Sequence, residues 1–118
     1  MVLYLKMAEK TWAKSDYTDS ATYDLTGTVY DENSLATTRD ISGFTGTFRL
    51  INLKGDLMYS SSVGLTLNAD GTFLMKFAEG SAPYITGNAK VRLRLEVSGS
   101  RLTAVGVNGS DMVFFERD

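Results

Sequence analysis

Residues 89–97 read AKVRLRLEV, and this stretch decides the fold class. Its odd positions are apolar, and its even positions are charged: Lys90, Arg92, Arg94 and Glu96. Strict alternation predicts a β-strand with one buried and one solvated face, as in an antiparallel sheet, whereas a helix would scatter the charged residues around its circumference. The stretch therefore predicts a strand of an all-β protein.

The same alternation extends outward along the chain. It recurs in residues 23–30 and 44–51, and the segments between alternating stretches carry glycine next to polar residues, which favours tight turns. Residues 78–88 are long enough for a crossover between two sheets. The spacing predicts a β-sandwich of about seven to nine antiparallel strands. Turns are expected at 53–56, 68–71, 98–100 and 108–110.

The chain of 118 residues fits one domain that can bury a core without covalent cross-links. Residues 1–17 differ from the rest, because a short apolar run precedes a polar run that carries the only tryptophan, Trp12. This segment is either the first strand of the sandwich or an arm that docks onto the sheet edge of a partner. Residues 18–118 are expected to form the sandwich domain itself.

The composition removes several kinds of chemistry. The chain has no cysteine and no histidine, which excludes disulfides, thiolate metal sites and imidazole proton transfer. A net charge of −2 with a pI near 5.1 gives no basic footprint for nucleic acid. The apolar run 2–5 ends at Lys6, too short for a signal-peptide core or a membrane span. We expect a globular domain that binds neither nucleic acid nor membrane.

Two short motifs are similar to the paired Asp-Thr/Ser-Gly motifs of aspartic proteases: DLTG at 24–27 and DISG at 40–43. In those enzymes the aspartate directly precedes the hydroxyl residue, so that two loops bring the carboxylates together. Here an apolar residue intervenes in both motifs. We therefore interpret Asp24 and Asp40 as residues that open turns. Gly27 lies within an alternating stretch and predicts a bulge or a close approach of another group.

Other motifs are interpreted structurally as well. Residues 68–79 begin like a calcium loop, but the sixth position, which needs glycine in such a loop, is Phe73. Residues 108–110 match a glycosylation sequon and are interpreted as a turn. The sequence contains no Gly-x-Ser-x-Gly nucleophile elbow and no phosphate-binding glycine loop. We therefore predict no catalytic, cofactor-binding or metal-binding residue, no small-molecule substrate and no enzymatic activity.

Charged and aromatic residues leave two kinds of binding open. The basic stripe of residues 90, 92 and 94 either forms a solvated sheet face, which the continuation of the row by Glu96 favours, or contacts an acidic partner. A sugar-binding sandwich would display aromatic rings on one face, and the candidate rings form no evident platform in the sequence. They are Trp12, Tyr30, Tyr59 and Tyr84.

A longer pattern of turns and strands begins with DISG at 40–43 and FTGTFRL at 44–50. It continues at 54–56, 69–73, 85–87, 91–97 and 109–111. In this pattern the chain resembles, from about Thr22 to Glu116, a family found in tailed bacteriophages: the N-terminal domain of baseplate upper proteins and related tail-appendage modules. The usual Gly-Tyr of that family is replaced here by Gly87-Asn88, and residues 1–17 match nothing in it.

The resemblance implies an antiparallel immunoglobulin-like β-sandwich and a non-enzymatic virion structural protein. It implies a tail or baseplate adaptor that holds tail-fibre or receptor-binding components through protein–protein contacts, in several copies, after assembly in the host cytoplasm. Two alternatives remain, a capsid decoration protein and a carbohydrate-binding module. If the N-terminal segment is a docking arm, its partner-binding residues are expected to be Val2, Tyr4, Leu5, Trp12 and Tyr17.

Overall fold

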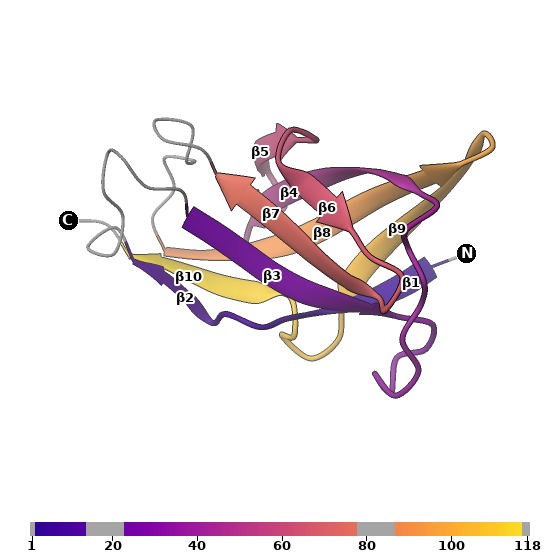
Figure 1. The fold of residues 1–118 in the computed structure, drawn as a ribbon. Coiled ribbons are helices and arrows are strands. Elements are labelled where there is room, and N and C mark those ends of the chain that lie inside the picture. Colours follow the sequence, from indigo (N-terminus) through magenta and orange to yellow (C-terminus); the bar gives the residue numbers. More distant parts are fainter. Residues whose placement is uncertain (1, 14–22, 78–86, 117–118) are drawn as a thin grey trace.

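The structure is a computed structural model that describes residues 2–13, 23–77 and 87–116. Its described residues are all-β: they form ten strands and contain no helix. The strands are β1 (Val2–Met7), β2 (Thr11–Ala13), β3 (Tyr23–Tyr30), β4 (Thr45–Asn52), β5 (Leu57–Ser61), β6 (Leu65–Leu67), β7 (Thr72–Phe77), β8 (Gly87–Val97), β9 (Ser100–Gly106) and β10 (Met112–Glu116) (Figure 1). The predicted alternating stretches at 23–30, 44–51 and 89–97 are β3, β4 and most of β8.

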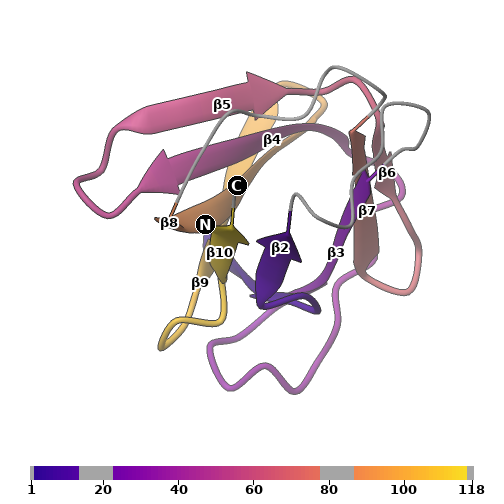
Figure 2. The ribbon, with the colours of Figure 1, turned by 90° about the vertical axis from the view of Figure 1, so that its left-hand side faces the viewer.

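The long strand β8 organises the sheet. β4 pairs with it from Ala89 to Glu96, so β10 and β9 share its other edge, β10 near its start and β9 near its end. From β9 the sheet continues through β1, β3 and β7 to β6, and from β4 it continues to β5. Figure 2 shows the result, a strongly curled sheet whose inner faces surround the core. The sheet is open, since β5, β6 and β2 each have a single strand neighbour among the described strands.

Strand direction differs from the prediction of a purely antiparallel sheet. β1 runs parallel to β9, and β2 runs parallel to β10, while the other pairs are antiparallel. Alternation of apolar and polar residues specifies the faces of a strand and carries no information on the direction of its neighbour. The number of strands, ten, also exceeds the predicted seven to nine, and β2, with three residues, is too short to show a period of two.

The core lies on the inner face of the curled sheet. Ala89, Val91, Leu93 and Leu95 of β8 are 0 % exposed, as their alternation predicts, whereas Val97 at the end of the strand is 38 % exposed. One aromatic group of the core joins Trp12 to Phe115, whose ring centroids are 5.6 Å apart. A second group joins Phe48, Tyr59 and Phe77 in edge-to-face contacts, the favoured geometry for aromatic pairs.

Turn residues lie where the sequence predicts them. Ser98 and Gly99 both have positive φ, as a two-residue hairpin loop between β8 and β9 requires. Gly71 has a φ of 91° in the turn between β6 and β7, so the residues that begin like a calcium loop form a hairpin turn. Asn108 and Gly109 form the predicted turn before β10. Most of the predicted crossover at 78–88 falls outside the described residues.

Gly27 marks a close approach, as predicted, and not a bulge. The pairing of β3 with β7 continues through Gly27 without a shift in register. A Cβ at this position would lie 2.5 Å from the ring of Phe73 and 2.9 Å from the main-chain oxygen of Lys6. Only glycine therefore lets the Phe73 ring pack against the backbone of β3.

Candidate protein-interaction surfaces

The predicted partner-binding residues of the N-terminal segment lie in different environments. β1 is a strand inside the sheet, between β3 and β9. Leu5 and Trp12 are 0 % exposed, so their side chains belong to the core and are not available to a partner. Val2 is 48 % exposed and Tyr4 is half-buried. Tyr17 lies outside the described residues.

The two aspartates of the protease-like motifs have separate structural roles. Asp24 lies exposed on β3, while Asp40 opens a turn in the connection between β3 and β4. The Asp40 carboxylate accepts hydrogen bonds from the amide and the hydroxyl of Ser42, at 2.9 and 2.7 Å, and these bonds lower the pKa of Asp40. A group that is more acidic than usual and exposed is poorly suited to proton transfer near neutral pH.

The described residues offer no other chemical centre. No group of three or more acidic side chains among them could hold a metal ion, and no helix among them is long and apolar enough to cross a membrane. A shallow hollow of about 330 Å³ beside β3 and β7 is lined by Thr26, Thr28, Asn68, Thr72 and apolar neighbours, without a charged side chain. That the chain is not an enzyme stays a prediction.

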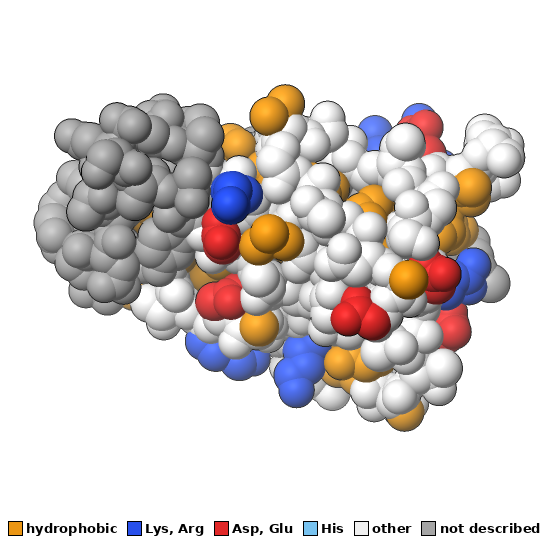
Figure 3. Space-filling view, viewed as in Figure 1, with side chains coloured by type: hydrophobic (Ala, Val, Ile, Leu, Met, Phe, Trp, Pro, Cys, Tyr) orange, Lys and Arg blue, Asp and Glu red, His pale blue; other side chains and the backbone are white. Residues whose placement is uncertain are grey.

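Four of the seven exposed large apolar side chains among the described residues lie on β5 and the turns on either side of it. They are Leu53 (60 % exposed), Leu57 (48 %), Met58 (47 %) and Val63 (82 %). In Figure 3 a few hydrophobic atoms protrude at the upper rim of the molecule, near the place of β5 in Figure 1, and other hydrophobic groups are scattered over the same face. Clustering of this kind is a mark of interaction surfaces, whereas single exposed apolar residues are ordinary.

β5 also has the most open edge of the sheet. Its main chain pairs with β4 on one side and with no described strand on the other. Its sequence, LMYSS, has none of the charges or prolines that commonly protect an edge strand. The other two edge strands, β2 and β6, have three residues each against five in β5.

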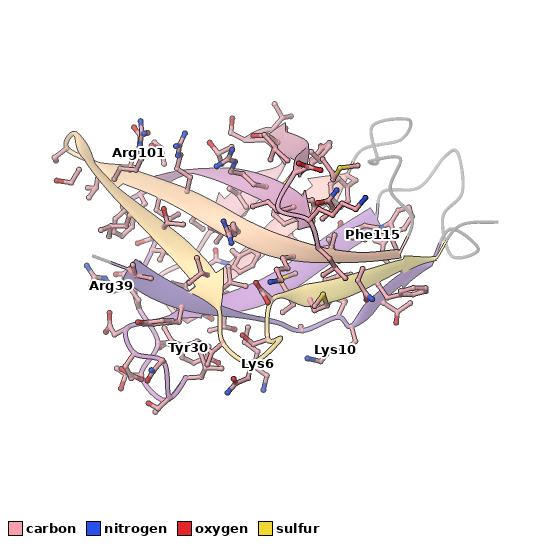
Figure 4. The ribbon with its side chains drawn as sticks, turned by 180° about the vertical axis from the view of Figure 1, so that it is seen from behind. Lys6, Lys10, Tyr30, Arg39, Arg101 and Phe115 are labelled. Carbon is pink, nitrogen blue, oxygen red and sulfur yellow. The ribbon has the colours of Figure 1, made fainter. Side chains whose placement is uncertain are left out.

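A second surface is the outer face of β4 and β8, which we call the basic face (Arg49, Lys90, Arg92 and Arg94). Figure 4 shows the molecule from the side opposite to that of Figure 1, and in this view β8 crosses the side nearest the viewer. In the antiparallel register Arg49 lies directly opposite Arg92. The two ion pairs among the described residues lie elsewhere, between Arg39 and Asp31 and between Arg101 and Glu96.

Sequence reasoning found part of these surfaces. It noted the stripe on β8, but it did not place Arg49 beside it, because the pairing of β4 with β8 joins residues about forty positions apart. The apolar residues at 53–63 have two local features that can indicate an exposed apolar surface. Leu57 and Met58 are adjacent, which breaks the alternation, and Leu53 and Val63 lie in turns, where large apolar residues are unusual.

Comparison with protein-family models and with curated proteins finds no match to this chain. The resemblance to phage tail-appendage domains therefore stays a prediction from the sequence pattern.

Proposed function

We propose that the chain is a non-enzymatic structural protein that joins other proteins, and that a strand of a partner pairs with the free edge of β5. The observation that carries this proposal is the combination, on one hairpin, of an unprotected strand edge and four exposed apolar side chains. Strand addition gains main-chain hydrogen bonds along the edge, while exposed alternate side chains supply apolar contacts. Monomeric proteins commonly protect such an edge against pairing with another chain.

The setting that we propose is the virion of a tailed bacteriophage, with the chain as a tail or baseplate adaptor for fibre or receptor-binding components. Its support is the sequence resemblance, together with an all-β fold whose sheet curls around a core. The parallel pairs β1–β9 and β2–β10 are a departure from the immunoglobulin-like sandwich that the resemblance implies. In this setting the partners are other virion proteins in several copies, where a second contact becomes intramolecular and weak single interfaces suffice.

The two alternatives have less support. A capsid decoration protein would use the same edge, and only its position in the particle differs. A carbohydrate-binding module would need exposed rings, and among the four candidate aromatic residues Trp12 is buried, Tyr30 and Tyr59 are half-buried, and Tyr84 lies outside the described residues. Tyr59 also packs its ring against Phe48 and Phe77 of the core.

The setting is tested by electron microscopy of purified phage particles whose chain carries a label at its C-terminus. Label at the tail tip or baseplate is the expected result. Label on the capsid shell would overturn the adaptor proposal in favour of the capsid decoration protein. A particle without label would overturn both virion assignments.

The edge is tested by Met58→Lys, with Val97→Lys as the matched control. Both residues are partly exposed, at 47 and 38 %, but only Met58 lies on the edge strand. A charge on the edge disfavours strand addition, so we expect Met58→Lys to fold normally and to lose incorporation into particles, while Val97→Lys is incorporated. Equal incorporation of both variants would show that β5 is not the interface.

A further inference from the structure

The basic face is a concentration of charge that the rest of the chain does not explain. Its four cations lie in three adjacent cross-strand rows, in which Lys90 faces Ile51, Arg92 faces Arg49 and Arg94 faces Thr47. None of the four forms an ion pair or a side-chain hydrogen bond with a described residue. The whole chain is acidic, with 14 Asp and Glu against 12 Lys and Arg. The next alternate residue of β8, Glu96, is paired with Arg101 and not with a residue of the basic face.

This arrangement has a cost in stability. Like charges directly opposite each other on neighbouring strands are destabilising, and Arg49 and Arg92 are such a pair. The Nε atom of Arg92 is also buried and has no hydrogen-bond partner, which adds a desolvation cost. A face that only needed solvation would incur neither cost. The repulsion would be relieved by a ligand that brings negative charge between the two guanidinium groups.

The surroundings of the cations indicate the kind of ligand. Ser60 lies opposite Arg49 on β5, and a shallow hollow of about 220 Å³ beside Arg94 is lined by the hydroxyl residues Thr45, Thr47 and Ser62 and by Glu96 at its far side from the basic row. Hydroxyl groups donate hydrogen bonds to carboxylates, and guanidinium groups pair with them in a two-pronged geometry. The cations of β8 repeat every second residue, a spacing of roughly 6.6 Å that matches alternate side chains of any extended chain.

We propose that the basic face binds an extended acidic segment of a partner protein, with Asp or Glu at alternate positions facing Lys90, Arg92 and Arg94. Arg49 shares the carboxylate that faces Arg92, which removes the repulsion between the two guanidinium groups. Glu96, which lines the hollow beside Arg94, ends the basic row, so the acidic positions of the segment face only the three rows of Lys90, Arg92 and Arg94. This site is separate from the free edge of β5 and does not require it.

An acidic protein segment fits this face better than a nucleic acid. The patch is three rows long, and a chain with a net charge of −2 would repel a long polyanion outside those rows. No aromatic ring lies among the residues of the basic face or its hollow to stack on bases. A short acidic segment needs neither feature.

The test uses the full chain and a synthetic peptide in which glutamate alternates with threonine, with binding followed by fluorescence anisotropy. The reference probe is the same peptide with glutamine in place of glutamate. We expect Arg49→Gln and Arg92→Gln each to weaken binding of the glutamate peptide about tenfold, the effect of losing one charge-assisted hydrogen bond. Raising the salt concentration weakens the binding of the original chain as well. Lys6→Gln, which removes one positive charge from the exposed side of β1, is the matched control and is expected to bind normally.

A second measurement separates a binding role from a structural one. Because Arg49→Gln removes the like-charge pair, we expect its urea unfolding midpoint to be equal to or above that of the original chain while its binding falls. A lowered midpoint together with unchanged binding would overturn the proposal. So would equal binding of the two peptides, tighter binding of a single-stranded DNA through the same arginines, or a salt-sensitive dimer that Arg49→Gln dissociates.

Discussion

β1 and β5 start from similar sequences and end in opposite environments. Both contain a short apolar run, VLYL in β1 and LMY in β5. β1 has a strand on each side, and its inward residues Leu3, Leu5 and Met7 are at most 1 % exposed. β5 has one strand neighbour, and Leu57 and Met58 are about half exposed. Apolar content alone therefore does not distinguish a strand that holds the fold together from one that is open to a partner.

The difference arises from contacts made by distant parts of the chain. The turn before β10 packs against β1, where the Ser110 hydroxyl donates to the Leu5 carbonyl at 2.7 Å and the Met7 amide donates to the Ser110 carbonyl at 2.8 Å. β9 then supplies the second strand neighbour of β1. No described segment does the same for β5, whose outer edge is unpaired among the described strands.

The largest expected effect comes from shortening equivalent leucines in the two strands. Leu5→Ala removes a side chain that is 0 % exposed and should lower the free energy of unfolding by about 3 kcal/mol. Leu57→Ala, at a position 48 % exposed, should change it by less than about 0.5 kcal/mol. Urea denaturation of both variants measures the difference. Similar losses in the two variants would show that β5 contributes to the core as β1 does.

A smaller effect is expected beside β1, at the glycine that lets Phe73 pack. Gly27→Ala places a Cβ 2.9 Å from the main-chain oxygen of Lys6 in β1, and the backbone has to shift. We expect a loss of about 2 kcal/mol, the usual cost of overpacking.

The control is Gly43→Ala, where an added Cβ meets nothing within 4 Å. Its urea midpoint should match that of the original chain. If Gly27→Ala also left the urea midpoint unchanged, the close contact between β3, β7 and β1 would not be a constraint on the fold.

The all-β class and the faces of the strands were predictable because they depend on local alternation. The inward residues of β8 and the turns at Gly71, Gly99 and Gly109 lie as predicted. The parallel position of β1 beside β9 was not predictable, since it pairs residues about a hundred positions apart and alternation does not encode direction.

The candidate sites show the same limit. The stripe on β8 is local and was noticed, but its partner Arg49 became visible only through the register of β4. For the N-terminal segment the sequence left both a first strand and a docking arm open, because apolar residues suit contact with a partner and are also what an inner strand needs. Leu5 and Trp12 are buried for that reason. Which strand keeps a free edge is decided by the whole topology, and no single stretch of sequence contains that information.

The smallest expected effect concerns an exposed residue whose substitution should still destabilise the fold, in contrast to Leu57→Ala. Asp70 is exposed, yet its carboxylate accepts hydrogen bonds from the Thr72 hydroxyl at 2.6 Å and the Thr72 amide at 3.0 Å, and these lower the pKa of Asp70 below its ordinary value of 3.8. A carboxyl group whose pKa is lower in the folded chain stabilises the fold at pH values above 3.8, and this contribution is lost as the pH falls toward the folded-state pKa. Asp70→Ala should therefore lower the urea midpoint slightly at pH 7, and the gap to the original chain should narrow at pH 3. A gap that stays constant between the two pH values would mean that the charged form of Asp70 adds nothing to the turn before β7.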